Sequence, residues 1–375
     1  MHIVVNGFFL GKSKTGIGQY LLHILRHLLP ETPHQWTLLV PEELRDSLPE
    51  DLESFIRDRI VFLKPLKKGD SLLTTILWEK FTLPNYVSSL KADVVWSPSF
   101  AVSTFPKNIR SVMTIHDVIP WKLPEYTASW KRRAYNRLLE SVAKAPNLEV
   151  ITISEFSQDE ITEVLGIPSN RITVTPLASS KDTRNVDTSK VPEYPYIVYV
   201  GGLEQRKNVD NLLKAIVQAK HSAPDIRLIV TGKYSPHPLI TPVPDLIQTY
   251  GLESNVTLSG YISDAELTGL IQEARALIYP STYEGFGLPI LEGMALSTPV
   301  ITSSIGVMRE VAGDAAELVD PHNVSDMARG ILSVWEDESY RHELVKKGSV
   351  RVQEFRWERT AKLTLQVLEG NKAVS

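Results

Sequence analysis

The chain contains no cysteine. This absence excludes disulfide bonds, thiolate zinc sites and a cysteine nucleophile, and it fits a reducing compartment without requiring one. Long apolar runs are also missing, because no stretch reaches the ~18 uninterrupted apolar residues of a membrane-spanning helix. The N-terminal sequence Met-His-Ile-Val-Val-Asn has no basic segment before its short apolar run, so we expect no signal peptide.

An excess of positive charge is absent as well, since the formal net charge is -4. We therefore expect no general binding of nucleic acid. No Asp-x-Asp pair occurs, so no obvious carboxylate pair would hold a metal ion on a diphosphate. The Gly-x-Gly-x-x-Gly fingerprint is missing near the first strand, which argues against a dehydrogenase. Gly11-Lys12-Ser13 imitates the end of a P-loop, but Asn6 stands where the first glycine is required, which excludes an ATPase of that type.

What the chain does have is a repeated alternation of short β-branched runs and helical patterns. Its 375 residues are long for one core and suit two domains, and its 43% hydrophobic and 22% charged residues are ordinary for a globular protein. Such alternation predicts parallel sheets covered on both faces. The expected strands are Ile3–Val5, Trp36–Val40, Asp93–Trp96, Val112–Ile115, Glu149–Ile153, Tyr196–Val200, Arg227–Thr231, Val256–Leu258 and Ala276–Tyr279.

The alternation breaks at 178–195, a polar segment with two prolines that we interpret as an interdomain linker. We expect an N-terminal domain over 1–180, completed by a C-terminal helix over 355–375, and a second domain over 195–354. Both should be doubly wound α/β domains. Because ligands bind beyond the carboxyl ends of parallel strands, two such domains are expected to face each other across a cleft.

The most specific motif is Ser281-Thr-Tyr-Glu-Gly-Phe-Gly-Leu-Pro-Ile-Leu-Glu292. Gly285 and Gly287 let the backbone approach a ligand, and Pro289 favours a helix start. A helix N-terminus attracts an anion, and Glu292 can accept from ribose hydroxyls. An ordinary glycine-rich loop before a helix is the alternative interpretation. The pair of acids, Glu284 and Glu292, around this turn favours a ligand that carries both a diphosphate and hydroxyls.

A second motif is Gly201-Gly-Leu-Glu-Gln-Arg-Lys-Asn208, which follows an expected strand. Gly202 permits a close turn. Arg206 and Lys207 would place two cations at the carboxyl end of that strand, which suits a diphosphate. We expect Asn208 to cap the next helix. Taken alone, the motif also fits a solvated basic loop.

Two further features belong to the first domain. His116 and Asp117 follow the strand at Val112–Ile115 and so stand where a doubly wound domain exposes functional groups. A single histidine is also often structural. Gly16 and Gly18 lie after the first strand and open the first helix, where small residues let a ligand or the opposing domain approach.

One surface has two interpretations. Leu72–Leu83 is largely apolar, and Trp130-Lys-Arg-Arg133 is followed by Arg137 one helical turn later. These segments fit a buried helix and a solvated helix face. They also fit a surface that touches a membrane or an anionic lipid carrier.

Together these residues resemble the retaining glycosyltransferases of family 4, which have the two-domain GT-B fold. The resemblance covers nearly the whole chain. Its most specific part is the pair of acids Glu284 and Glu292, eight residues apart. The other matching segments are Gly16-Ile-Gly18, His116-Asp-Val-Ile-Pro120, Gly201-Gly-Leu-Glu-Gln-Arg-Lys207, Gly260-Tyr-Ile262 and the terminal segment Phe355–Trp357.

The resemblance implies roles for the second domain. Glu292 would bind the ribose hydroxyls, and Arg206 and Lys207 would hold the diphosphate next to the turn at Gly202. Glu284 would hold the donor sugar, and the backbone at Ile262 would meet the base. The backbone N–H groups that would assist Glu284 at the sugar and the distal phosphate belong to Phe286, Gly287 and Leu288.

In the first domain, the resemblance implies that His116 contacts the donor sugar and the reaction centre. Gly16 and Gly18 would allow this domain to close on the donor. The expected enzyme is retaining and metal-independent, has no cofactor and uses no carboxylate nucleophile. Its rate enhancement would come from positioning and charge stabilisation.

His116-Asp-Val-Ile-Pro, followed by Pro124-Glu125, most resembles the branch that builds bacterial surface polysaccharides, with many mannosyltransferases. The expected donors are GDP-mannose and UDP-glucose, which these residues do not distinguish. The acceptor would be an oligosaccharide or a lipid-linked one, and the location the cytoplasm, at the inner membrane face if the membrane is contacted. Two alternatives stay open: a nucleotide-sugar epimerase and a non-catalytic sugar-nucleotide-binding protein.

Overall fold

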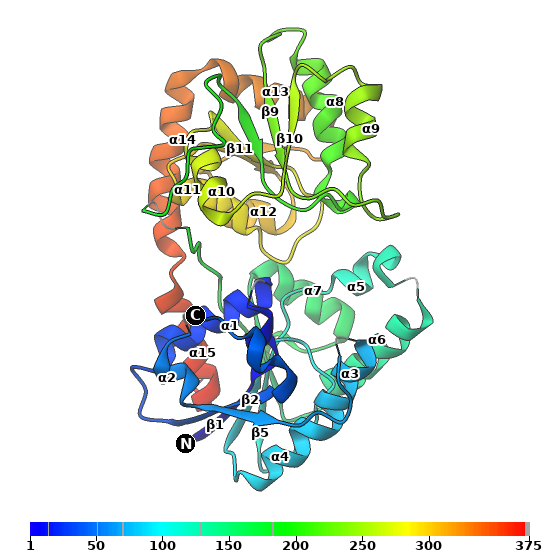
Figure 1. Ribbon diagram of the computed structural model, residues 1–375, viewed down its shortest axis with the longest axis vertical. Coiled ribbons are helices and arrows are strands. Elements are labelled where there is room, and N and C mark those ends of the chain that lie inside the picture. The colour runs from blue at the N-terminus through cyan, green and yellow to red at the C-terminus, as the bar shows by residue number, and fades with distance from the viewer. Residues whose placement is uncertain (14, 51, 70, 128, 182–183, 372–375) are drawn as a thin grey trace. The chain divides into compact units, whose positions relative to one another are not determined.

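The computed structural model describes residues 1–371 except 14, 51, 70, 128, 182 and 183. These residues form two compact units. The first consists of Met1–Leu177 and the C-terminal segment that begins at Trp357, and the second is Ala178–Arg356. Each unit is described here by itself (Figure 1).

The first unit is built on a parallel sheet of seven strands in the order β3-β2-β1-β4-β5-β6-β7. Its strands are β1 (His2–Asn6), β2 (Gln35–Pro41), β3 (Ile60–Leu63), β4 (Val94–Ser97), β5 (Arg110–Thr114), β6 (Leu148–Thr152) and β7 (Ile172–Val174). The order reverses after β1 and places β4 on its other side. Such a reversal creates a crevice at the carboxyl ends of the strands where ligands bind in doubly wound folds.

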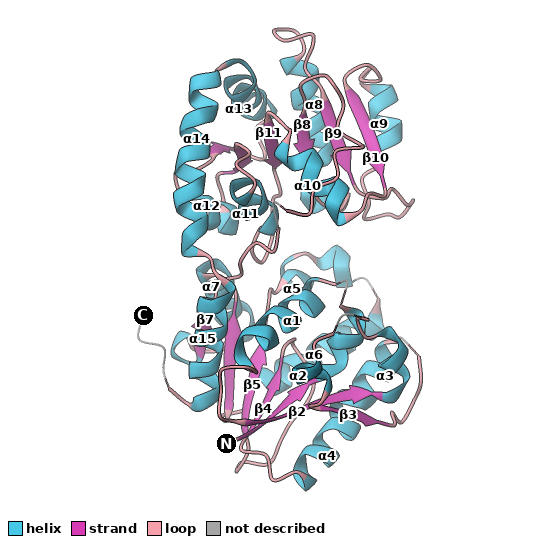
Figure 2. Ribbon diagram, turned by 60° about the vertical axis from the view of Figure 1, so that its left-hand side comes forward, coloured by secondary structure: helices cyan, strands magenta, loops and turns pink. Residues whose placement is uncertain are grey.

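Helices cover both faces of this sheet (Figure 2). The helical elements are η1 (Gly7–Lys12), α1 (Gly16–Leu28), η2 (Glu42–Ser47), α2 (Ser54–Arg57), α3 (Leu72–Leu77), η3 (Trp78–Thr82), α4 (Leu83–Ser89), α5 (Ile119–Lys122), η4 (Pro124–Thr127), α6 (Trp130–Ala143), α7 (Glu155–Leu165), η5 (Ser169–Arg171) and α15 (Trp357–Glu369). The segment Leu72–Leu83 is thus not one regular helix, because a π-helical turn, η3, separates α3 from α4.

The second unit has a parallel sheet of six strands in the order β10-β9-β8-β11-β12-β13. Its strands are β8 (Ile197–Tyr199), β9 (Leu228–Thr231), β10 (Val256–Gly260), β11 (Ala276–Tyr279), β12 (Val300–Ser303) and β13 (Glu317–Val319). Its helical elements are η6 (Gln205–Lys207), α8 (Val209–Ala219), α9 (Val243–Thr249), α10 (Asp264–Gln272), α11 (Leu288–Ala295), α12 (Gly306–Ala312), α13 (Val324–Glu336), α14 (Glu338–Arg351) and η7 (Val352–Glu354). Here the order reverses between β8 and β11.

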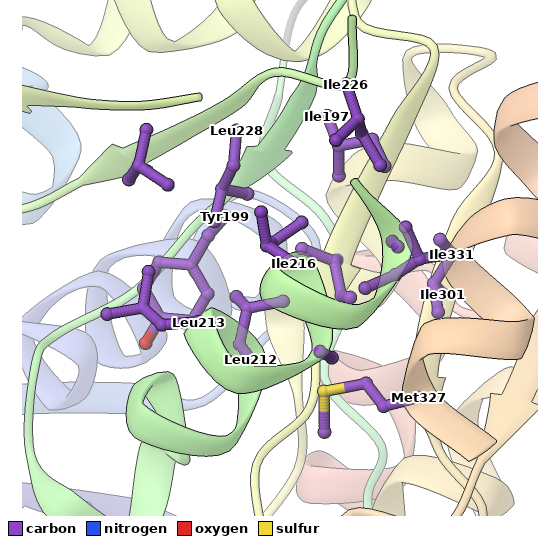
Figure 3. Close-up of a cluster of buried hydrophobic side chains, with 14 of the residues drawn as sticks. Ile197, Tyr199, Leu212, Leu213, Ile216, Ile226, Leu228, Ile301, Met327 and Ile331 are labelled. Atoms are coloured by element: carbon purple, nitrogen blue, oxygen red, sulfur yellow. The ribbon is translucent and has the colours of Figure 1, made fainter. Parts of the chain in front are cut away.

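A hydrophobic core holds the second unit together. Side chains of α8 such as Leu212 and Ile216 pack against Tyr199 and Leu228 of the sheet, and α13 covers the neighbouring strands (Figure 3). This burial follows from the apolar face of α8, whose apolar residues recur at helical spacing. Each fully buried Leu or Ile contributes about 1.5–3 kcal/mol. The core therefore makes a rigid base for the loops at the carboxyl ends of β8 and β11.

The expected fold class is confirmed, since both units are parallel sheets with helices on both faces. Four short strands, β3, β7, β12 and β13, were not among the expected ones. The described part of 178–195 has no helix or strand, but it belongs to the second unit. There the Asp187 N–H donates to the Ala265 carbonyl at 3.0 Å.

Within the described residues, no helix combines the length and the apolar character needed to cross a membrane.

Candidate functional site

The loops that follow β8 and β11 meet in the second unit. The Thr282 N–H donates to the Arg206 carbonyl at 2.8 Å, and the Thr282 hydroxyl donates to the same oxygen at 3.0 Å. In return, Arg206 Nη1 donates to the Tyr283 carbonyl at 3.1 Å. Because β8 and β11 pair side by side, residues distant in sequence share one edge of the sheet.

Glu284 joins both cations of the first loop. Its Oε2 lies 2.6 Å from Arg206 Nη1, and its Oε1 lies 2.7 Å from Lys207 Nζ. The structure therefore brings together three residues that the sequence assigned to two parts of a ligand. Burial alone would raise the pKa of Glu284, but the charges of Lys207 and Arg206 outweigh it and hold this pKa below its ordinary value.

The two cations respond differently to this environment. Burial lowers the pKa of Lys207, although the Glu284 carboxylate partly restores it. The pKa of Arg206 is raised, because Glu284 more than offsets burial. Glu284 contacts both cations and Glu204 also acts on them, and an ammonium and a guanidinium side by side at this edge suit a diphosphate.

The turn before α11 depends on glycine. Gly287 has a φ of +111°, a conformation that L residues rarely adopt, and it forms the N-cap of α11. Pro289 is the second residue of this helix rather than the first. Phe286 is buried and meets Phe355 edge to face at 5.9 Å. The turn thus presents the backbone of Phe286, Gly287 and Leu288 beside Glu284.

Glu292 lies one turn into α11, in a different environment from Glu284. Burial raises its pKa, Lys181 opposes that effect, and Asp264 adds to it. Lys181 Nζ is 3.7 Å from Asp264 Oδ1. Asp264 begins α10, two residues after Ile262, at the carboxyl end of β10. The charge of Asp264, which follows the Ile262 loop, therefore acts on Glu292.

Asn208 differs from the expected helix cap. It stands at the N-cap position of α8 in a left-handed conformation, with φ 65° and no capping bond from its side chain. Its amide nitrogen donates instead to the carbonyls of Pro280 at 3.1 Å and Pro321 at 2.7 Å. Asn208 thereby ties the Arg206–Lys207 turn to the loop after β11.

His116 lies at the carboxyl end of β5 in the first unit. Its Nε2 is 2.9 Å from the Pro98 carbonyl, and a carbonyl only accepts, so Nε2 carries the proton. Burial lowers the pKa of His116 to about 4. The neutral ring therefore keeps a lone pair on Nδ1, which can accept from a hydroxyl.

The two glycines of α1 are not equivalent. A Cβ on Gly18 would overlap the Lys12 carbonyl oxygen, so only glycine fits there without a backbone shift. Among the described residues, none beyond its chain neighbours and the backbone of its own helix has an atom within 4 Å of a Cβ placed on Gly16. Gly18 is thus required by the packing of its own unit, whereas space around Gly16 is open.

Two neighbours of this site escaped the sequence analysis. Tyr279 ends β11, and its hydroxyl accepts from Lys207 Nζ at 2.7 Å. Its place at the carboxyl end of a strand could have singled it out. Lys181 had no comparable signal, because it lies in the segment interpreted as a linker. Within the described residues, no group of three or more His, Asp or Glu side chains could hold a metal ion.

Comparisons with known proteins cover both units. The family model "Glycosyltransferase Family 4" matches residues 14–178, and "Glycosyl transferases group 1" matches residues 180–351. The O-antigen chain mannosyltransferase B of Escherichia coli is 31% identical over 271 residues, which are 68% of this chain and 69% of that protein. The serotype-specific mannosyltransferase WbdA of Escherichia coli is 25% identical over 75% of this chain, but the match spans only 37% of its length.

Solved structures agree in fold. Sucrose-phosphate synthase from Thermosynechococcus elongatus superimposes with a TM-score of 0.75 at 18% identity and covers 99% of this chain and 98% of its own. Anabaena HepE in complex with UDP-glucose gives a TM-score of 0.72 at 16% identity, covering 99% of this chain and 100% of its own. At these identities the likeness concerns the fold alone.

Proposed function

Because the chain belongs to the glycosyltransferases of family 4, we propose that it transfers a hexose, mannose or glucose, from a nucleoside diphosphate sugar to a hydroxyl of a growing oligosaccharide. The relatives named as O-antigen and serotype-specific mannosyltransferases support a role in the synthesis of a surface polysaccharide. GDP-mannose and UDP-glucose are the candidate donors. The UDP-glucose bound by Anabaena HepE supports a nucleotide sugar as the class of ligand.

The observation that carries this proposal is the cluster of Arg206, Lys207 and Glu284. The two cations would bind the diphosphate and stabilise the charge that develops on it as the sugar leaves. Glu284 Oε1 is in an ion pair but, among the described residues, has no aligned hydrogen bond. It can therefore accept from a sugar hydroxyl, with the backbone of Phe286, Gly287 and Leu288 beside it.

The remaining roles are assigned on position. Glu292 would accept from the ribose, near the base that meets Ile262. Neutral His116 would accept a sugar hydroxyl at Nδ1. Gly202 would admit the diphosphate at the turn, and Gly16, with open space around it, would allow close approach in the first unit. Gly18 would support this approach of the donor indirectly, because the absence of a Cβ lets α1 pack closely against the Lys12 carbonyl.

We propose retention of anomeric configuration without a bound metal. The bond between the anomeric carbon and the diphosphate oxygen breaks while the acceptor oxygen bonds to the same face of the sugar. The acceptor proton passes to the departing phosphate oxygen, so no protein base is consumed. The chain contributes positioning and electrostatic stabilisation.

Calorimetry with UDP, GDP and ADP tests the donor site. One of the first two should bind, and the Lys207→Ala variant should bind it more weakly. An assay with the matching sugar nucleotide and oligosaccharide acceptors should then yield a glycoside. An epimerised donor would indicate an epimerase, and binding without transfer or donor hydrolysis would indicate a non-catalytic protein. Either outcome would refute the proposal.

The acceptor is proposed to be lipid-linked, with the enzyme at the inner membrane face. Trp130 at the start of α6 is 70% exposed, and Lys131, Arg132 and Arg133 beside it are exposed as well. Leu73 of α3 also lies open to solvent. Figures 1 and 2 both show α3 and α6 side by side. Exposed apolar residues among cations are typical of a surface that binds anionic lipid.

Flotation with phosphatidylglycerol-containing liposomes tests this surface. The wild-type protein should float with the vesicles, and reversing Lys131, Arg132 and Arg133 to Glu should abolish flotation. The same reversal at Lys346, Lys347 and Lys362 serves as the control and should retain it. Equal flotation of both variants, or none by the wild-type protein, would contradict the membrane contact.

A further inference from the structure

Tyr279 is a buried tyrosine that the roles above do not use. It ends β11 and is only 2% exposed. Lys207 Nζ donates to its hydroxyl at 2.7 Å and lies 5.0 Å from the centre of its ring. A tyrosine this deeply buried could have been replaced by phenylalanine if it served packing alone. The position of its hydroxyl therefore suggests a function that involves Lys207.

The hydrogen bond to Tyr279 sets the direction of the Lys207 ammonium. The contact between Lys207 Nζ and Glu284 Oε1 is an ion pair at 2.7 Å. Among the described residues, that carboxylate oxygen receives no aligned hydrogen bond. Charge attraction alone constrains the direction of the N–H groups weakly, whereas a hydrogen bond constrains it strongly. One of the three N–H groups of Lys207 thus points at the phenol oxygen. The other two N–H groups can then rotate only about that N–H bond.

Tyr279 keeps its proton and so remains a neutral hydrogen-bonding group. Burial, followed by the negative charge of Glu284, raises the pKa of Tyr279 well above its ordinary value. The charged or titratable groups around Lys207 are Glu284 and Tyr279 from the β11 side and Arg206 and Glu204 from its own loop. Glu284 and Glu204 favour the charged ammonium, whereas Arg206 and burial oppose it.

We propose that Tyr279 is a positioning residue, whose hydroxyl holds the ammonium of Lys207 in the direction from which it meets the departing diphosphate. This inference rests on the proposed function, in which Lys207 neutralises that leaving group. Without the hydroxyl, the buried ammonium loses one hydrogen-bond acceptor and is less well stabilised in its charged form. Lys207 would then be aimed less accurately and would lose its proton at lower pH.

The test compares Tyr279→Phe with the wild-type enzyme across pH 6 to about 10. The variant should lower kcat/KM for the donor about 10-fold, as expected for one hydrogen bond to a charged group. The basic limb of its pH profile should move to lower pH by about one unit, since a pKa unit corresponds to the same tenfold factor. A merely structural hydroxyl would leave that limb where it is.

Tyr196→Phe is the matched control. Tyr196 is also buried, and its hydroxyl donates at 2.9 Å to the carbonyl of Leu270, which is not one of the proposed site residues. This variant should change thermal stability without shifting the pH profile. An unshifted profile in Tyr279→Phe, or an equal shift in both variants, would overturn the inference.

A second substitution guards against misfolding of the first. Incorporating 3-fluorotyrosine at position 279 keeps the ring and the hydroxyl but weakens the oxygen as an acceptor. It should shift the basic limb in the same direction by a smaller amount, and an unchanged limb would count against the proposal. Failure of the proposed function would look different, because the wild-type enzyme itself would then transfer no sugar.

Discussion

At the scale of single residues, the second unit places one carboxylate between two cations. Glu284 forms ion pairs with both Arg206 and Lys207, and the pKa of Lys207 lies below its ordinary value because of burial. A cation in such a place interacts strongly with a diphosphate, since little water competes for it. The loss of either cation should therefore have a large effect.

Lys207→Ala should lower kcat by about 100-fold or more, the scale of losing an electrostatic donor to a transition state. Steady-state kinetics with a saturating donor measures this effect. Lys214→Ala, which removes a half-exposed lysine paired with Asp210 on α8, is the control and should keep wild-type rates. Wild-type turnover in Lys207→Ala would refute the proposed diphosphate site.

Glu292→Ala should mainly raise the donor KM, because the proposed ribose contact would be made equally before and during the reaction. We expect a rise of about 10-fold with kcat changed much less, the scale of one hydrogen bond to a charged group. Glu273→Ala, an exposed acid at the end of α10, should leave both parameters unchanged. A variant with normal KM and reduced kcat would show that Glu292 acts on the reacting centre instead.

At the scale of elements, the π-helical turn η3 carries an unusual buried acid. Glu79 is 3% exposed, and burial raises its pKa to about 7. Its Oε2 accepts from the Val102 N–H at 3.0 Å and from the Tyr135 hydroxyl at 3.3 Å. Glu79 thus links η3 to α6 and to the loop after β4, whose Pro98 carbonyl holds His116.

Glu79→Gln should stabilise the protein at pH 8 and have little effect at pH 4. Between the ordinary pKa of 4.5 and the folded value of about 7, the folded chain retains a proton that the unfolded chain has released. The free energy of unfolding therefore falls as the pH rises through this window, by about 3 kcal/mol at most. Glutamine keeps an acceptor oxygen and has no proton to lose.

Thermal melts of both proteins from pH 4 to pH 8 measure the difference. Glu79→Ala is the informative companion, since it leaves the Val102 N–H without its partner and should be destabilised at every pH. Parallel melting curves for wild type and Glu79→Gln over this range would show that Glu79 titrates normally.

At the scale of the whole molecule, helix α15 belongs to the same unit as β1 and α1. Trp357 of α15 stacks on His23 of α1 at 4.6 Å, and Arg110 donates to the carbonyls of Val367 at 2.8 Å and Leu368 at 2.9 Å. The second unit is thus an insertion between the main part of the first unit and its last helix. Stability of the first unit should depend on α15, whereas the residues of the proposed nucleotide site belong to the second unit.

Trp357→Ala should lower the free energy of unfolding by about 3 kcal/mol, as for other buried tryptophans. Its affinity for the nucleoside diphosphate should stay close to the wild-type value. Calorimetric unfolding and titration measure the two quantities, and Lys362→Ala, on the exposed side of α15, is the control. Loss of nucleotide affinity in the folded variant would mean that the site depends on α15.

Local patterns in the sequence were sufficient to predict the two doubly wound units and to single out the Glu284–Glu292 segment as a candidate site. Strand–helix alternation can be recognised over short ranges, and a glycine turn before a helix can be recognised from a few residues. Their place after expected strands singled out Arg206, Lys207 and His116, and the family resemblance then implied roles for them. The short strands β12 and β13 escaped because a run of a few apolar residues is ambiguous between strand and helix.

The sequence by itself determined the fold class, the family and the residues that carry charge to the carboxyl ends of the strands, because these follow from local periodicity and motif spacing. Only the tertiary structure decided which of those residues touch. Lys207 and Tyr279 are 72 positions apart, and Arg206 and Tyr283 are 77 apart, yet the pairing of β8 with β11 makes them neighbours. The pairing of distant strands is set by the packing of the whole unit. No local sequence pattern therefore indicates that Tyr279 contacts Lys207 or that Lys181 lies near Glu292.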